Sequence, residues 1–211
     1  WTWSHALDQV SDPFDGRGFY SLPQDGSQLR LERASANFDA RHRATGLLVW
    51  DLPAAKAAFF FRDWRLAATV ESQTGQPYTV NTSLDRNGDG NLTDRLETMN
   101  GITVHAGDPI ALRLGPAVSA LSLVAPSQGK SGRVQRNSFR ADPIATVDVA
   151  LSRRFSFSDG RSLAVRAEVF NLFNRTHFGI PVRTLESPGF GRNFDTQVDP
   201  RAVKFSLRLI F

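Results

Sequence analysis

The sequence closes on Val203-Lys204-Phe205-Ser206-Leu207-Arg208-Leu209-Ile210-Phe211, a run in which apolar and polar side chains alternate. A period of two predicts a β-strand with one apolar and one polar face. About nine to eleven residues is also the length that a tilted strand needs to cross a bilayer. Alternation alone does not show whether the apolar face of the strand contacts lipid or a protein core. The segment therefore fits either the last strand of an outer-membrane β-barrel or the last strand of a soluble sandwich.

The bulk composition excludes several classes of protein. The longest apolar run, Ala57–Phe61, is far shorter than the roughly eighteen residues of a transmembrane helix. The chain has no cysteine, which excludes disulfides and thiolate metal sites. The formal net charge is +4, but the basic residues are scattered, so we expect no nucleic-acid partner. No motif supports catalysis, and we expect no enzyme and no catalytic residue.

Six extended segments are predicted, and the connections between them differ in length. The short connections are Pro53–Lys56 and Ser158–Arg161, the second of which carries an Asp-Gly hairpin signal. The long connections, about 8–35, 73–143 and 172–202, are rich in turn-forming residues. The extended segments themselves are about 1–7, 36–52, 60–72, 144–157, 162–171 and 203–211.

Short and long connections alternate strictly along the chain. Membrane barrels have short periplasmic turns and long extracellular loops, whereas a soluble sandwich has no reason to sort its loops in this way. We therefore predict an all-β fold: an antiparallel up-and-down transmembrane β-barrel segment of about six strands, with residues 84–140 irregular or poorly ordered. Trp1–His5 looks like the middle of a strand, so we expect residues 1–211 to be the C-terminal part of a longer polypeptide.

Aromatic side chains gather near the short turns, where a barrel would meet a membrane interface. They flank both turns and include the last residue of the sequence. The set comprises Trp50, Phe59, Phe60, Phe61, Trp64, Phe155, Phe157 and Phe211.

The polar positions of the predicted strands are candidates for a ligand path through the lumen. The simpler interpretation is that they form cross-strand charge pairs on a wet wall. These residues are Arg41, Arg43, Arg65, Arg154, Arg166, Glu168, Lys204 and Arg208.

The segment 85–94 contains oxygen-bearing side chains at alternate positions, followed by glycine. Asp85, Asn87, Asp89 and Asp94 are candidate Ca²⁺ ligands, because this spacing resembles the first half of an EF-hand loop. The match ends there: the twelfth position is Leu96 instead of a bidentate Glu, and no flanking helices are predicted. The alternative is a polar, glycine-rich surface turn without a metal.

Several motifs, taken in order, resemble one family. They are Trp1–Asp8, Arg41–Arg43 with Trp50–Pro53, Thr74–Val80, Asp85–Gly90 with Asp94-Arg95, Arg166–Asn174 and the final strand. This order is similar to the C-terminal barrel region of TonB-dependent outer-membrane receptors, and most similar to the Oar-like group. The resemblance covers nearly the whole chain, although each motif alone is only moderately specific.

The resemblance implies a barrel of about twenty-two strands, plugged by an N-terminal domain, that takes up a ligand with energy from the TonB complex. The chain departs from that pattern because it has no plug, no TonB-contacting box and only six predicted strands. Six strands cannot enclose a ligand-sized lumen. We therefore expect uptake of an unidentified ligand to belong to a parent chain that supplies the plug and the remaining strands.

The resemblance also implies a location and an assembly signal. The expected location is the outer membrane of a Gram-negative bacterium, in contact with its lipid. In the family the last strand is an address for the barrel-assembly machinery, which here assigns that role to Phe205, Leu207, Leu209 and Phe211. The alternative from a different class is a soluble or surface-exposed calcium-binding β-sandwich that acts as an adhesion or interaction module.

Overall fold

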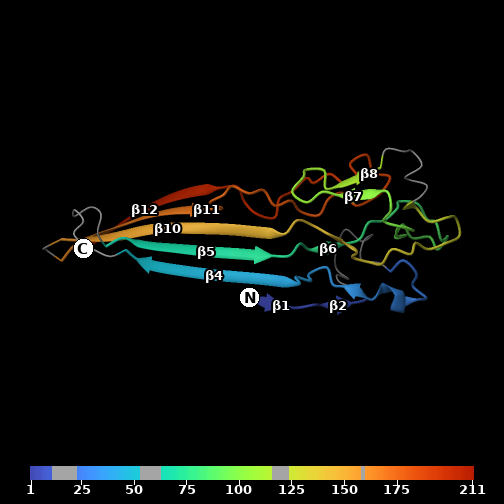
Figure 1. Ribbon diagram of the computed structural model, residues 1–211, viewed down its shortest axis with the longest axis horizontal. Helices are drawn as coiled ribbons and strands as arrows, with labels where there is room; N and C mark the ends of the chain where they lie inside the picture. The colour runs from blue at the N-terminus through green and yellow to red at the C-terminus, as the bar shows by residue number, and fades with distance from the viewer. Residues whose placement is uncertain (11–22, 53–62, 116–123, 158–159) are drawn as a thin grey trace.

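The computed structural model describes residues 1–10, 23–52, 63–115, 124–157 and 160–211. One six-stranded antiparallel sheet dominates them, in the order β1-β4-β5-β10-β11-β12 (Figure 1). Because this order follows the chain, the sheet is an up-and-down meander, as the sequence predicts. The sheet is open, with β1 and β12 at its edges. Its strands are β1 (Thr2–Trp3), β4 (His42–Asp51), β5 (Arg65–Gln73), β10 (Ile144–Ser156), β11 (Ser162–Phe170) and β12 (Ala202–Ile210).

The observed strands agree with the prediction best where the alternation is strictest. The bounds of β10, β11 and β12 lie within one residue of the predicted segments. β5 begins at Arg65, and the predicted strand residues 60–62 lie outside the described residues, as do the predicted turn Pro53–Lys56 and residues 158–159.

Two predicted strands were wrong in part: one begins later than predicted, and the other is interrupted. The second begins at His42 instead of residue 36, because residues 36–39 form a turn in which the Asp39 N–H donates to the Ala36 carbonyl at 2.9 Å. The Asp39 carboxylate then accepts the Ala6 N–H at 3.0 Å. The first segment, predicted as continuous over 1–7, divides into β1 and β2 (Leu7–Asp8), and β2 pairs with β3 (Ala34–Ser35).

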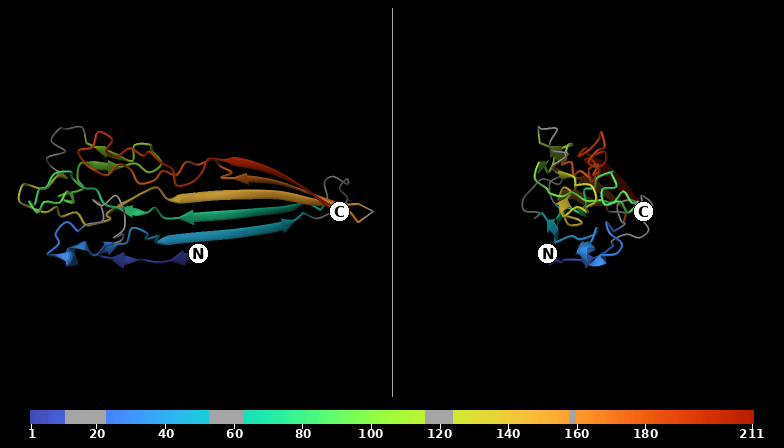
Figure 2. Two further views of the ribbon diagram at one scale, coloured as in Figure 1. Left: turned by 180° about the vertical axis from the view of Figure 1, so that it is seen from behind. Right: turned by 90° about the vertical axis from the view of Figure 1, so that its right-hand side faces the viewer.

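The three long connections gather beyond one end of the sheet and form what we call the cap, namely the described residues of 23–41, 74–143 and 171–201 (Figures 1 and 2). Isolated β-bridges join these connections, including one between Asn81 and Thr184. Regular structure in the cap is sparse. It consists of the 3₁₀ helix η1 (Leu29–Glu32) and the short strands β3, β6 (Pro77–Tyr78), β7 (Ile102–Val104), β8 (Leu112–Leu114) and β9 (Phe139–Arg140).

The buried apolar core lies in the cap and not in the sheet. The rings of Tyr78 and Phe139 stack across the β6–β9 pair with centroids 5.7 Å apart. The described residues of 84–140 are mostly irregular, as predicted, apart from three short strands, and they pack around this core. The core residues are Tyr78, Val80, Leu96, Leu112, Val124, Ala125, Phe139 and Leu185.

The alternative of a β-sandwich is wrong. Besides the main sheet, the described residues contain only two-stranded sheets, so no second large sheet packs against the first as a sandwich requires. In the part of the chain that the structure describes, no helix is long and apolar enough to span a membrane.

Candidate functional site

The strand register places seven of the eight candidate lumen residues on one face of the main sheet. Residues paired directly across antiparallel strands point to the same face. Ser152 pairs with both Arg65 and Arg166, and Ser206 pairs with Arg166, so these residues form one row. Counting in steps of two along each strand adds Arg43, Arg154, Glu168, Lys204 and Arg208 to the same face.

Charged side chains on this polar face form pairs, as the simpler interpretation predicts. Arg65 contacts both carboxylate oxygens of Asp51, at 2.6 and 3.2 Å. Arg43 contacts Glu71 at 2.7 Å across β4 and β5. Two further contacts, from Arg166 at 2.8 Å and Lys204 at 4.0 Å, converge on Glu168. Apart from Glu168, the side chains of these pairs are well exposed, so each pair contributes little to stability. Ligand contact by this face stays a prediction.

Arg41 lies apart from the other seven. It precedes β4, and its guanidinium lies 3.6 Å from Asp39 and 2.9 Å from the His5 ring. Arg41 therefore belongs to the junction between the sheet and the cap.

The 85–94 segment folds as a tight turn around its own carboxylates. Asp85 accepts the N–H groups of Gly88, Asp89 and Gly90 at 2.7–3.2 Å. Gly88 and Gly90 have φ values of 80° and 88°, in the left-handed region that glycine adopts without strain. The glycines of the motif thus shape a turn whose carboxylates bind backbone N–H groups.

Asp94 lies beneath this turn and is buried. Its Oδ2 accepts the Arg86 and Asn87 N–H groups at 2.5 and 3.0 Å, while its Oδ1 is buried without a hydrogen-bond partner. Burial raises the pKa of Asp94, those two N–H bonds oppose the rise, and the nearby charges of Asp89 and Asp85 add to it.

The geometry of this turn leaves calcium binding untested. Within the described ranges, no three His, Cys, Asp or Glu side chains form a group that could hold a metal ion. A Ca²⁺ ion here would also need the Asn87 amide and backbone carbonyl oxygens. Calcium binding by Asp85, Asn87, Asp89 and Asp94 therefore stays a prediction.

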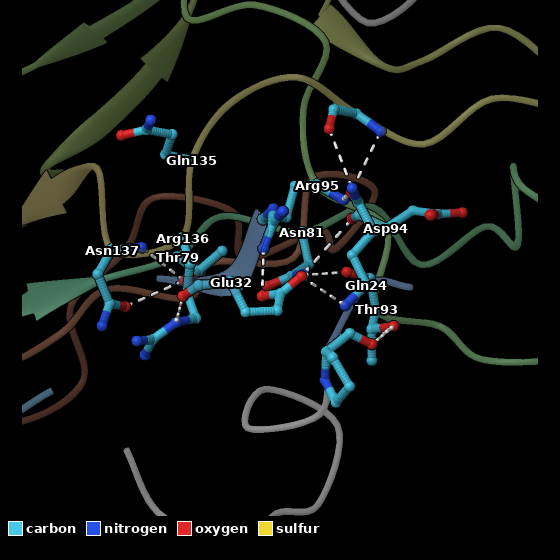
Figure 3. Close-up of polar contacts among 12 residues, drawn as sticks. Gln24, Glu32, Thr79, Asn81, Thr93, Asp94, Arg95, Gln135, Arg136 and Asn137 are labelled. Atoms are coloured by element: carbon cyan, nitrogen blue, oxygen red, sulfur yellow. Dashed lines mark hydrogen bonds and ion pairs between the residues drawn. The ribbon is translucent and has the colours of Figure 1, made fainter. Parts of the chain in front are cut away.

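A buried polar network, which sequence reasoning missed, joins three segments of the cap (Figure 3). Arg95 and Glu32 form an ion pair at 2.6 Å with side chains only 6% and 1% exposed. The Gln24 side chain accepts the N–H groups of Arg95 and Gly132 and donates to the Gly132 carbonyl at 3.0 Å. Arg136 donates to the Glu32 carbonyl at 3.0 Å. The only sequence signal was the Asp94-Arg95 motif, since nothing in the sequence singles out Glu32 or Gln24.

The face of the sheet opposite the polar face is mainly apolar and exposed; an exception on β10 is Arg153, which is buried and lies 4.1 Å from the centroid of the Phe155 ring. On β12, alternation from Lys204 and Arg208 places Val203, Phe205, Leu207 and Leu209 on it. Phe205 and Leu207 are 79% and 76% exposed. A contiguous exposed apolar surface on a sheet is what a membrane strand presents to lipid.

Comparison with known proteins gives one match. A family model for the outer membrane beta barrel domain matches residues 1–204. No curated protein and no solved structure matches the chain. The match spans nearly the whole chain and agrees with the meander, the two-faced strands and the exposed apolar face. The chain therefore belongs to the outer membrane beta barrel domain family and is a β-barrel protein of the outer membrane.

Proposed function

We propose that the chain is the C-terminal barrel part of a TonB-dependent, Oar-like receptor that takes up a ligand across the outer membrane. The observation that carries this proposal is the cap. The described parts of the three long connections fold together beyond one end of the sheet, as the extracellular loops of a receptor would.

Two of the motifs that resemble this receptor group supply contacts within the cap. In the Thr74–Val80 motif, a Cβ on Gly75 would lie 1.8 Å from the Ala141 carbonyl oxygen, and Tyr78 and Val80 belong to the core. In the Arg166–Asn174 motif, Asn171 adopts φ 47° and donates to the carbonyls of Arg175 and Asp199. These two motifs therefore contain residues that shape the loops of the cap.

The test is to isolate the natural polypeptide that contains this chain and to assay its binding to the periplasmic domain of TonB. We expect a plug domain on the N-terminal side and TonB binding that is lost when the TonB-contacting box of the plug is deleted. A polypeptide that carries no plug and forms a barrel without one would overturn the receptor proposal and leave the family assignment intact.

A second part of the proposal concerns assembly: Phe205, Leu207, Leu209 and Phe211 form the signal read by the barrel-assembly machinery. Phe211 is almost fully exposed and has no packing role in the described residues. We expect Phe211→Ala to lower the amount of assembled protein in the outer membrane, measured by the gel shift between unboiled and boiled samples. Phe194→Ala, which removes an exposed aromatic from the cap, is the matched control. Equal amounts of assembled protein in the two variants would contradict this role.

A further inference from the structure

Four arginines on the polar face alternate with small residues in two neighbouring rows. In the first row, Ser152 and Ser206 stand on either side of Arg166. In the second row, Ala164 stands between Arg154 and Arg208. Arg65 of β5 completes the first row beside Ser152. Each small residue is therefore bordered by long cationic side chains.

This arrangement forms a hollow of about 620 Å³. Ser152, Ala164 and Ser206 form part of its lining, and the four arginines contribute to the rest together with Arg153, Val165 and the carboxylates Asp51 and Asp63. Strands lie about 4.8 Å apart, so the backbones of Arg154 and Arg208 are separated by about 10 Å across β11. Both residues lie within three positions of the strand ends remote from the cap. We call this feature the arginine hollow.

The arginines of the hollow differ in their partners. Arg65 pairs with Asp51, and Arg166 pairs with Glu168. Among the described residues, no acidic side chain pairs with Arg154 or Arg208. Elsewhere on the same face, Arg43 and Lys204 each have an acidic partner. The positive charge without a partner is thus concentrated at two positions that face each other across Ala164.

We propose that the arginine hollow binds an oxyanion carrying two negative charges, such as a phosphate or dicarboxylate group. Arg154 and Arg208 would neutralise the charge, since planar guanidinium groups donate paired hydrogen bonds to phosphate and carboxylate oxygens. The Ser152 and Ser206 hydroxyls supply further donors at the lining. The short methyl side chain of Ala164 leaves the space that the anion occupies. This inference rests on the polar face alone and does not depend on the TonB-dependent receptor proposal.

The test is calorimetric titration of the full polypeptide in lipid nanodiscs, with inorganic phosphate and with succinate in separate experiments. We expect binding that weakens as salt is added. The double variant Arg154→Gln/Arg208→Gln should bind about tenfold or more weakly, because each charge-assisted hydrogen bond contributes on the order of the energy of one decade in affinity. Binding of phosphate alone identifies a phosphoryl ligand, and binding of succinate alone identifies a carboxylate ligand.

The matched control is Arg43→Gln/Lys204→Gln, which removes two cations from the same face but spares the hollow. It should retain wild-type affinity. The gel shift on boiling checks that both variants form a barrel. No binding of either anion at millimolar concentration, or an equal loss of affinity in the two double variants, would overturn the proposal.

Discussion

The sheet and the cap are stabilised in opposite ways. Leu207, on the apolar face of β12, is 76% exposed, whereas Leu96 in the cap is fully buried. The sheet is ordered by the backbone hydrogen bonds of its ladders, and its apolar face needs lipid to cover it. The cap has little regular structure but its own apolar core and buried ion pairs. Long loops on a membrane barrel can therefore form a folded unit that lipid does not stabilise.

The ion pairs of the sheet and of the cap also differ in how deeply they are buried. On the sheet, Arg43 and Glu71 meet at 2.7 Å with both side chains well exposed. In the cap, Arg95 and Glu32 meet at 2.6 Å in near-complete burial. An exposed pair gains little because water already solvates both ions, whereas removing one ion of a buried pair leaves the other without compensation.

The largest expected effect comes from breaking the buried pair. Glu32→Gln keeps the shape of the side chain but leaves the Arg95 guanidinium buried without its counter-ion. We expect the cap to lose about 3–5 kcal/mol of stability. Hydrogen exchange of the Gln24 and Arg95 backbone amides, which donate to Glu32 and Gln24, measures this loss locally.

The control for this prediction is Glu71→Gln on the exposed pair of the sheet. Exchange of the cap amides should be unchanged in it. If Glu32→Gln leaves exchange in the cap as slow as in the wild type, the network does not hold the three segments together.

The second effect separates packing in the cap from lipid contact on the sheet. Leu96→Ala removes buried methyl groups and leaves a cavity, so we expect the cap to lose about 2–5 kcal/mol. Leu207→Ala should leave no cavity, because fluid lipid fills the vacated space. It loses only the free energy of transferring the removed methyl groups from water to lipid, so we expect a loss of stability of about 2 kcal/mol or less. Denaturant unfolding in nanodiscs, with exchange of cap amides to localise the change, compares the two.

The two substitutions should also change amide exchange in different parts of the molecule. Leu96→Ala should accelerate amide exchange in the cap and leave β10 and β11 protected, whereas Leu207→Ala should leave the cap unchanged. Faster exchange throughout the molecule in both variants would show that the sheet and the cap unfold as one unit.

The sheet could be predicted from sequence because its information is local. Strict alternation over β10, β11 and β12 fixes both the strands and the face that each side chain occupies. The alternation alone was enough to predict which residues lie on the polar face. The arginine hollow could not be predicted in this way, because it depends on the register between strands. Only the cross-strand pairing shows that Ala164 separates Arg154 from Arg208.

The cap could not be predicted because its contacts join residues far apart in sequence. Glu32 and Arg95 are 63 residues apart, and Arg136 contacts Asp8 over a separation of 128. Asp39 shows how a local pattern misleads. It continues the alternation of β4 backwards, but its buried carboxylate accepts the Ala6 N–H and pairs with Arg140, which ends the strand pattern.

The smallest expected effect is the pH dependence of the 85–94 turn. The pKa of Asp94 is raised in the folded cap, mainly by burial, so the folded state holds this proton more tightly than the unfolded state. The contribution of Asp94 to stability should therefore be fully present below the ordinary pKa of aspartate, 3.8, and be lost as the pH rises through the raised value. Asp94→Asn should remove this dependence and stabilise the cap at pH 7 in the presence of a chelator, measured by denaturant midpoints across pH.

Bound calcium would reverse the effect of Asp94→Asn on the stability of the cap. The amide oxygen that Asp94→Asn introduces can still accept the Arg86 and Asn87 N–H groups, but it lacks the charge that a divalent cation requires. If the turn binds Ca²⁺, millimolar calcium should stabilise the wild type by mass action and leave Asp94→Asn unchanged. Magnesium, which tolerates such flexible sites poorly, is the control ion. Equal midpoints of the wild type with and without calcium, together with no heat on titration, would show that the motif is a metal-free turn whose glycines serve its shape.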